Sequence, residues 1–349
     1  MKIVLPALML PRSGGSRTVI ATANLLAEAG HEVRIVTATG TAPFFLAPTV
    51  RFETTGPIDY AVSARSFHLA LRRIRRRLVD ADRIILTFFP LLLAVPRAML
   101  ASTVVWMQSD DAHLSRILRP PLLRSSIKEV IARLSYLLPV RRYAVSTWLA
   151  TRLWKRYGLR CQVLYPVVDT DLFKPPPAVD PALAGCMGWL EPYKGTRGIV
   201  AAVAIARARR HSLRLRIIGC TPAGIADRNW MESRHPMDDR SLVDDLGGCG
   251  AFIQASRFEG FGLPPLEAMA CGVPVAARGG TGADDYLTDG VNCLMFDNDQ
   301  PNAIAGTLRR LLADPGLAGS LRSGGLHTAA RFSLRARRNE IAGALGERW

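Results

Sequence analysis

The chain contains 349 residues and carries a formal net charge of +16 at pH 7. A hydrophobic content of 49% with 21% charged residues is typical of a folded protein with a sizeable core and excludes a disordered chain. The length exceeds that of most single domains, so we expect two. Six cysteines lie far apart with no C-x-x-C pair, which indicates reduced thiols of a cytoplasmic protein and argues against a disulfide framework.

Strands and helices alternate through the first half of the chain. The expected elements are a strand at 2–8, a glycine loop and helix over 13–30, strands at 31–38, 82–89 and 103–109, and a short strand continuing as a helix over 143–158. This βαβ order predicts a parallel, doubly wound sheet. The longest uncharged run, Ile84 to Pro96, has 13 residues. A spanning helix needs roughly 20, so we expect none.

A basic amphipathic helix is predicted over residues 65–82. Its apolar stripe consists of Phe67, Leu71, Ile74 and Leu78. Arginines at its other positions include Arg72, Arg73, Arg75, Arg76 and Arg77. The pattern fits either a solvated helix on an ordinary core or a helix lying on acidic lipid. An inward stripe would leave membrane binding purely electrostatic, whereas a stripe in lipid would keep binding intact at moderate salt.

Most of the positive charge lies in the first half of the chain. Residues 1–175 contain 25 Lys and Arg against 11 Asp and Glu (+14), and the remainder contains 20 against 18 (+2). Such asymmetry indicates an anionic partner for the first half. No aromatic interleaving or recognised motif accompanies the arginines, which argues for a membrane surface rather than nucleic acid.

The second half repeats the alternation after a proline-rich stretch at 165–177, a plausible domain boundary. Its expected elements are strands at 184–190, 213–219, 251–256 and 273–277, and helices within 191–210, 241–249, 264–272 and 302–314. Two such halves would face a central cleft. Ligands of these sheets bind at the carboxyl ends of the strands, where the loops at 13–16 and 258–262 fall.

The stretch "FEGFGLPPLEAMACG" at 258–272 places two glutamates around a glycine-rich bend. Glu259 follows a strand, and Glu267 lies near the start of the next helix. Pro264 and Pro265 suit a first helical turn, and Gly272 suits a helix end. Structure alone can account for such a unit, because the helix dipole favours a glutamate in that turn.

Several stretches together resemble the retaining glycosyltransferases of family four, which have the two-domain GT-B fold. Residues 143–315 carry the resemblance in "AVSTWLATRLWKRYG", "VLYPVVDTDLFKP", "GWLEPYKG", "FEGFGLPPLEAMACGVPVAA" and "DGVNCLMF". The N-terminal "LPRSGGSRTVIATANLLAEAGHEVRIVT" is similar to the family's opening strand, glycine loop and helix. The Glu-x7-Glu stretch with its flanks is the specific signal, and the glycine loop alone would be weak.

The resemblance implies a nucleotide-diphosphate sugar as donor. Backbone N–H groups beside two helix starts would hold its phosphates, and Lys194 would stabilise the departing diphosphate. Glu267 would accept hydrogen bonds from the ribose, and Glu259 would contact the sugar and support positive charge near C1. The implied catalytic residues are Glu259 and Lys194. The implied donor-binding residues are Gly14, Gly15, Gly188, Lys194, Gly260, Phe261, Gly262, Leu263 and Glu267.

Some positions depart from the family pattern. Gly188-Trp189 stands where Gly-Arg usually precedes the Lys-Gly pair, so one cation is missing from the motif. Gln108 stands where many members have a histidine, and His113 follows five residues later. Both are acceptor-side candidates, with an ordinary loop histidine as the alternative for His113. Asp285 stands where an acidic residue commonly follows the glycines.

No metal is expected in this reading. Two D-x-D triplets occur at 169–171 and 297–299, and such triplets bind manganese in the unrelated GT-A fold. The first falls in the linker and the second in a loop after the "NCLMF" stretch, so neither is placed among the donor residues.

The sequence therefore predicts a retaining, metal-independent transferase that moves a hexose to a glycan or lipid-linked acceptor at the cytoplasmic membrane face. The expected domains are 1–170 on the acceptor side and 171–330 on the nucleotide-sugar side, with a helix within 331–349 able to pack back on the first. Two alternatives remain open: a degenerate GT-B protein that binds glycan or a partner without turnover, and a sugar-nucleotide 2-epimerase.

Overall fold

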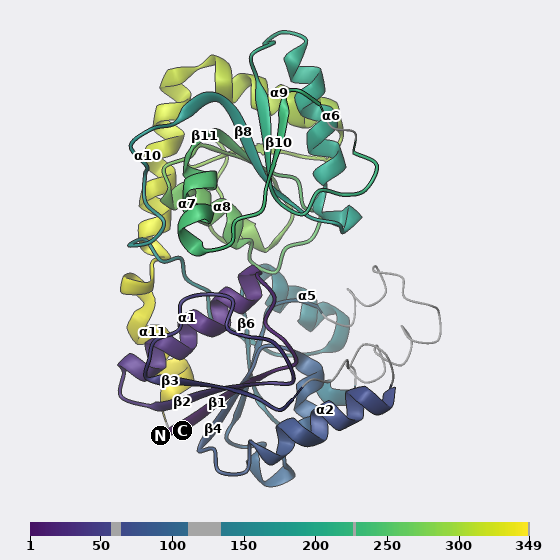
Figure 1. The fold of residues 1–349 in the computed structure, drawn as a ribbon, viewed down its shortest axis with the longest axis vertical. Coiled ribbons are helices and arrows are strands. Elements are labelled where there is room, and N and C mark those ends of the chain that lie inside the picture. The colour runs from purple at the N-terminus through teal and green to yellow at the C-terminus, as the bar shows by residue number, and fades with distance from the viewer. Residues whose placement is uncertain (57–63, 111–133, 226–227, 348–349) are drawn as a thin grey trace. The chain divides into compact units, whose positions relative to one another are not determined.

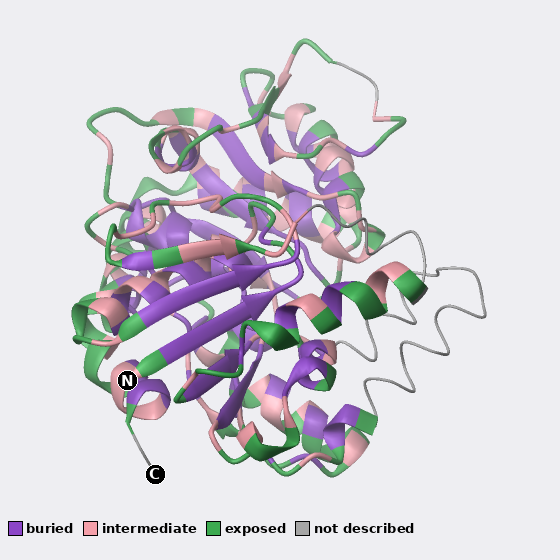
Figure 2. Ribbon diagram, turned by 60° about the horizontal axis from the view of Figure 1, so that its bottom comes forward, coloured by how far each residue is buried: buried purple, intermediate pink, exposed green. Residues whose placement is uncertain are grey.

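The computed structural model describes the chain except for residues 57–63, 111–133, 226–227 and 348–349 (Figure 1). The chain forms two compact units. The first consists of Met1–Tyr165 and Arg338–Trp349, and the second of Pro166–Arg337. Within each unit the central strands are buried and the helices expose their outer faces (Figure 2).

The first unit is built on a parallel sheet. Within the described residues it has seven strands in the order β3-β2-β1-β4-β5-β6-β7, and the chain winds outward from β1 in both directions. This order is that of a doubly wound Rossmann sheet, as predicted. The strands are Lys2–Ala7 (β1), Glu32–Thr37 (β2), Val50–Thr54 (β3), Arg83–Leu86 (β4), Thr103–Met107 (β5), Arg141–Ala144 (β6) and Gln162–Val163 (β7).

Helices of the first unit begin at residues that cap them. Ser13 accepts a hydrogen bond from the backbone of Ser16 at the start of α1, and Ser146 does the same from Leu149 at the start of α5. Gly158, with φ +67°, ends α5. The helices are Gly14–Glu28 (α1), Ala64–Arg76 (α2), Phe89–Ala94 (η1), Arg97–Met99 (η2), Thr147–Tyr157 (α5) and Leu334–Gly346 (α11).

Helix α11 returns to the first unit from the far end of the chain. The carbonyl oxygen of Leu345 accepts from Arg83 Nη1 at 3.4 Å, and that of Ala344 accepts from the Tyr143 hydroxyl at 3.4 Å. Ile341 and Leu345 are fully buried. The last helix therefore completes the core of the unit that the first 165 residues begin.

The arginine-rich helix α2 ends at Arg76, earlier than the predicted 82. Backbone bonds from Arg77 to Ile74 and from Leu78 to Arg75 span three residues and tighten the chain into a turn. Leu71, Ile74 and Leu78 are buried in the unit. Phe67, the first residue of the stripe, is half-buried. Because the other three take the core, insertion of the stripe into lipid is wrong.

The arginines of this helix fall into two sets. Arg73 Nη1 donates to the carbonyl oxygen of Thr55 at 3.2 Å, and Arg77 Nη1 lies 3.5 Å from Glu53 Oε2, which fixes both to the β3 edge. Arg72, Arg75 and Arg76 are exposed. Within the described ranges, no helix is both long and apolar enough to cross a membrane.

The second unit is a second parallel sheet. Its strands have the order β10-β9-β8-β11-β12-β13 within the described residues. They are Asp180–Gly188 (β8), Arg214–Gly219 (β9), Met231–Arg234 (β10), Cys249–Gln254 (β11), Val275–Arg278 (β12) and Leu294–Phe296 (β13). The helices are Pro192–Lys194 (η3), Thr196–Arg207 (α6), Asp239–Gly247 (α7), Leu263–Ala270 (α8), Gly282–Asp285 (η4), Pro301–Ala313 (α9) and Pro315–Arg331 (α10).

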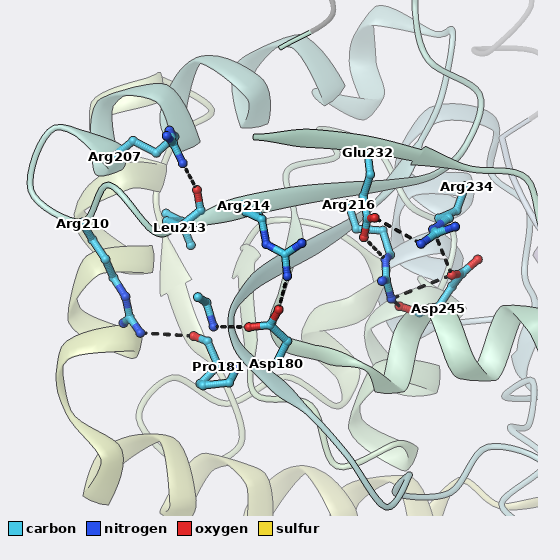
Figure 3. A network of polar contacts seen from close by, with 11 residues as sticks. Asp180, Pro181, Arg207, Arg210, Leu213, Arg214, Arg216, Glu232, Arg234 and Asp245 are labelled. Carbon is cyan, nitrogen blue, oxygen red and sulfur yellow. Dashed lines mark hydrogen bonds and ion pairs between the residues drawn. The ribbon is translucent and has the colours of Figure 1, made fainter. Parts of the chain in front are cut away.

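A polar network holds the β9–β10 edge of this sheet (Figure 3). Arg216 Nε lies 2.6 Å from Glu232 Oε1, and its Nη1 lies 3.8 Å from Asp245 Oδ1. Arg234 contacts the same two carboxylates. Positive charges in this half are thus matched by neighbouring carboxylates, which agrees with its small net charge.

Candidate functional site

The bend between β11 and α8 has the predicted strand–turn–helix form, but the turn is buried rather than exposed, and Glu267 lies beyond the first turn of α8. The strand ends at Gln254, Pro264 and Pro265 lie in the first turn of α8, and Gly262 takes φ +85°. A Cβ at Gly262 would meet Ala283 Cβ at 3.2 Å and the Tyr286 hydroxyl at 3.4 Å. Both the backbone conformation and the available space therefore require glycine at this position.

The start of α8 offers two backbone donors. Prolines lack an N–H group, so of the donors that a helix leaves unpaired at its first turn, those of Gly262 and Leu263 remain. Among the residues that the structure describes, no side chain caps this helix start. Two adjacent N–H groups at the positive end of a helix dipole suit an anionic oxygen.

Glu259 is 9% exposed and is held through one carboxylate oxygen. Its Oε1 accepts from Lys194 Nζ at 2.8 Å and from Gln254 Nε2 at 2.7 Å. Gln254 Nε2 also donates to Ser256 Oγ at 3.0 Å. Within the described residues no hydrogen bond involves Oε2, so this oxygen is the one that a ligand hydroxyl can reach.

Two glycines explain how Lys194 meets a residue 65 positions away. Gly195 has φ +80°, and a Cβ there would lie 2.7 Å from the carbonyl oxygen of Ala255, so the turn after β8 packs against the end of β11. A Cβ at Gly188 would collide with the carbonyl oxygen of Cys220. The approach of Gly195 to Ala255 brings the β8–α6 and β11–α8 turns together at the carboxyl edge of the sheet, and that of Gly188 to Cys220 packs the end of β8 against the end of β9.

Glu267 is 4% exposed and lies near a buried tyrosine. The hydroxyl of Tyr286 donates to the carbonyl oxygen of Gly262. Burial, followed by the charge of Glu259 and then of other groups that include Glu267, raises the pKa of Tyr286 well above its ordinary value. Both glutamates of the bend therefore act electrostatically on one residue, as expected for neighbours in one site.

An aromatic cluster packs around Phe261 of the bend. The ring centroid of Phe261 lies 5.1 Å from that of Tyr286 and 5.7 Å from that of Phe332. Gly260 is buried between Glu259 and Phe261 in the same turn. Rings at these separations pack favourably and fix the turn that carries the catalytic candidate.

The glycine loop of the first unit lies beside Gln108. Gly14 and Gly15 open α1, and a Cβ at Gly15 would lie 2.6 Å from Gln108 Oε1. Gln108 Nε2 is 3.4 Å from the carbonyl oxygen of Gly15. The structure thus brings this acceptor-side candidate to the glycine loop, whereas His113 lies outside the described residues.

The two D-x-D triplets have other contacts. Asp169 Oδ1 accepts from the backbone of Asp171 and Leu172 in a turn. Asp299 Oδ2 lies 3.2 Å from Arg257 Nε. In the part of the chain that the structure describes, no three His, Cys, Asp or Glu residues are grouped as metal ligands.

Sequence reasoning did not single out Gln254, Ser256, Thr196 or Tyr286 as residues of the site. Gln254 left a signal, because it is a polar residue at the carboxyl end of an apolar strand. Tyr286 left none, since its role depends on a contact with Gly262 across the fold.

Comparison with known families covers most of the chain. Residues 12–172 match the family described as Glycosyltransferase Family 4, and residues 167–327 match the family described as Glycosyl transferases group 1. The chain belongs to the family-four type of glycosyltransferases, and its two Rossmann-like units are those of the GT-B fold.

Sequence identity between this chain and individual relatives is low. The chain is 31% identical over 258 residues to a D-inositol 3-phosphate glycosyltransferase of Acidothermus cellulolyticus, covering 63% of this chain and 55% of that protein. It is 27% identical to a GDP-mannose-dependent alpha-(1-6)-phosphatidylinositol monomannoside mannosyltransferase of Mycolicibacterium smegmatis, covering 69% of each. The match thus spans about half the length of the first of these relatives.

A solved structure of the same fold is the Anabaena protein Alr3699/HepE in complex with UDP and glucose. The TM-score is 0.76 at 17% sequence identity, over 100% of both chains. At this identity the likeness establishes the fold alone.

Proposed function

We propose that the protein is a retaining, metal-independent hexosyltransferase that uses a nucleotide-diphosphate sugar. The observation that carries the proposal is the contact between Lys194 and Glu259 beside the two donors of the α8 start. A cation, a carboxylate and adjacent N–H groups at one sheet edge match the needs of a sugar diphosphate.

Each group has a role in holding the donor. Gly262 and Leu263 donate to phosphate oxygens, and Lys194 neutralises charge on the same phosphates. Glu267 accepts from the ribose hydroxyls. Glu259 faces the sugar with the oxygen that makes no other hydrogen bond, and its negative charge stabilises positive charge that develops near C1.

Transfer occurs on the front face of the sugar. The bond between C1 and the phosphate oxygen breaks, and the acceptor oxygen forms a new bond to C1 from the same side. The leaving phosphate takes the acceptor's proton, so no enzymic nucleophile is needed and the configuration at C1 is retained. Lys194 is already present where negative charge accumulates on the departing diphosphate.

The acceptor is a glycan or a lipid-linked acceptor, with Gln108 and His113 as residues on its side. Support comes from the basic first unit, whose exposed arginines on α2 suit an anionic membrane surface. One relative's name, a phosphatidylinositol monomannoside mannosyltransferase, also refers to a lipid-linked acceptor. We place the protein at the inner face of the cytoplasmic membrane as a peripheral protein.

Metal independence belongs to the same proposal, because Lys194 and the helix start supply the positive charge that a bound cation would otherwise provide. Transfer should continue at an unchanged rate in excess chelator. Loss of transfer with chelator and its return with manganese would contradict this point.

The experiment is transfer from labelled UDP- and GDP-hexoses to glycan and glycolipid acceptors, with the anomeric configuration read by NMR. A product of unchanged configuration is expected. A product of inverted configuration contradicts retention. Nucleotide binding without transfer favours the non-catalytic alternative, and conversion of the donor at C2 favours an epimerase.

A further inference from the structure

The ammonium of Lys194 lies among three neighbours. Its Nζ is 2.8 Å from Glu259 Oε1, 5.0 Å from the centroid of the Trp189 ring and 5.5 Å from that of the Tyr193 ring. Ammonium groups are attracted to aromatic faces within about 6 Å, and more strongly when they are shielded from water. The Lys194 side chain is 14% exposed, so the attraction is little screened.

Trp189 is anchored through its backbone. Its N–H donates to Thr196 Oγ1 at 3.1 Å, and the Thr196 hydroxyl donates back to the Trp189 carbonyl oxygen at 3.2 Å. Thr196 is 2% exposed and is the first residue of α6. The tryptophan is therefore fixed to the start of a helix at the point where the chain turns toward Lys194.

The indole N–H of Trp189 does not hold the ring. Its Nε1 is buried and has no hydrogen-bond partner within the described structure. Buried indole N–H groups ordinarily find an acceptor, and leaving one unpaired is unfavourable. The contact that the ring does make with a polar group is through its face, with the ammonium of Lys194.

This contact has a chemical consequence for a site with a single cation in its motif. A lysine side chain loses conformational entropy when its ammonium is fixed by a ligand. An aromatic ring that already holds the ammonium lowers this loss, because the side chain is ordered before the ligand binds. An ammonium has three N–H donors, of which one reaches Glu259. The other two donate to no residue in the described part of the chain and remain for phosphate oxygens.

We propose that Trp189 is a positioning residue for Lys194, and that its ring face, together with Tyr193, holds the ammonium where the diphosphate of the donor binds. The inference rests on the proposed function for the identity of the ligand. It rests on the structure alone for the contact between the ring and the ammonium.

The test uses Trp189→Phe, which keeps an aromatic face and lacks the N–H, and Trp189→Leu, which removes the face. Each is made with Lys194 intact and in a Lys194→Met background. Thr196→Val removes both backbone bonds to Trp189 and provides a second variant should Trp189→Leu fold poorly. Trp154→Leu is the matched control, because Arg160 lies over that ring at 5.2 Å in the first unit.

Affinities for UDP and GDP are measured by calorimetry, alongside kcat and KM for transfer. With Lys194 intact, Trp189→Leu should weaken nucleotide binding about 5- to 30-fold, the size expected for a shielded cation–aromatic contact. Trp189→Phe should restore binding to within about threefold. In the Lys194→Met background the two Trp189 variants should bind equally, and Thr196→Val should follow the direction of Trp189→Leu.

Three results would overturn the inference. The first is an equal loss of nucleotide affinity in Trp189→Phe and Trp189→Leu. The second is a loss from Trp189→Leu that is as large in the Lys194→Met background, and the third is a similar loss from Trp154→Leu. Transfer that is insensitive to Trp189→Leu removes the positioning role and leaves the proposed function intact. If nucleotide binding depends on Trp189 but no transfer occurs, the positioning role stands and the proposed function is overturned. Failure of both nucleotides to bind the unaltered protein overturns both.

Discussion

Glu259 and Glu267 occupy different surroundings although they lie eight residues apart. Glu259 is tied to Lys194 and Gln254 through one oxygen, in the turn before the helix. Glu267 belongs to α8 itself and is more deeply buried. A group in the turn can respond to changes at the sugar, whereas a group fixed in the helix suits a part of the donor that does not change during the reaction.

We expect substitution of the two glutamates to change different kinetic constants. Glu259→Gln should lower kcat on the order of 10²-fold, because it removes a charge that opposes the developing positive charge at C1. Glu267→Gln should raise the donor KM about 10-fold with a smaller change in kcat, since a ribose contact contributes equally to ground and transition states. Steady-state kinetics with varied donor measures both.

Gln254→Leu is the matched control for the first substitution, because it removes a neutral donor from the same carboxylate oxygen. It should lower kcat less than Glu259→Gln does. Wild-type turnover in Glu259→Gln would remove Glu259 from the catalytic residues.

Tyr286 provides a prediction about the bend. Tyr286→Phe removes the hydroxyl that donates to the carbonyl oxygen of Gly262 and keeps the ring packed against Phe261. Loss of one buried hydrogen bond should lower the free energy of unfolding by about 0.5–1.5 kcal/mol and raise the donor KM. Urea unfolding measures the first, and a gain in stability would show that the bond does not support the bend.

Residues of the site could be predicted where the chain carries them in a compact motif. Glu259, Glu267, Gly262 and Lys194 come from two short stretches, and the structure places Lys194 against Glu259. Gln254, Thr196 and Tyr286 were missed because their partners are set by the fold of the unit. The sequence showed that Trp189 stands where the family motif has a cation. Its contact with Lys194 could be found only in the structure.

At the scale of elements, the central strands were predicted and the edge strands β3, β7, β10 and β13 were not. The sequences of β3 and β10, "VRFET" and "MESR", are short and largely polar, as suits strands that pair on one side only and stay partly exposed. β7 and β13 have only two and three residues, too few to show a pattern. Hydrophobic patterning detects burial, so it finds strands at the centre of a sheet more readily than strands at its edge.

Helix α2 leads to a prediction about membrane attachment. Arg72, Arg75 and Arg76 are exposed, and each basic residue near an anionic surface contributes roughly 1 kcal/mol before screening. Their replacement by glutamine should therefore lower binding to acidic vesicles substantially. Because Leu71, Ile74 and Leu78 are buried in the core, binding should also disappear as salt increases. Vesicle flotation with and without acidic lipid measures both effects.

The control for this experiment changes the same amount of charge elsewhere. Arg209, Arg310 and Arg331 are exposed on the second unit, and their joint replacement by glutamine should leave flotation nearly unchanged. Equal binding to neutral and acidic vesicles, or equal loss in the two triple variants, would contradict attachment through α2.

At the scale of the whole molecule, two parallel sheets and a linker near residue 165 were within reach of sequence reasoning. The βαβ alternation predicts parallel strands, but the order of the strands in each sheet came from the structure. A C-terminal helix able to pack back on the first unit was expected, and residues from Arg338 onward belong to that unit.

Helix α11 also yields a matched pair of variants. Leu345 and Leu308 are both fully buried, the first in α11 and the second in α9 of the second unit. Each Leu→Ala substitution should lower the free energy of unfolding by about 2–5 kcal/mol. Hydrogen exchange should show the loss of protection in first-unit peptides for Leu345→Ala and in second-unit peptides for Leu308→Ala. Loss confined to the second unit in both would contradict the assignment of α11.

The place of α11 in the chain has a consequence for biosynthesis. The ribosome makes the second unit as one continuous stretch, but the first unit waits for residues that follow it. At about 5–20 residues per second, the interval between Tyr165 and Arg338 lasts roughly 10–35 seconds. During that interval the nascent first unit exposes the apolar surface that Ile341 and Leu345 later cover. A chaperone that binds apolar surface has this period in which to act, and it must release the surface before the last helix can dock.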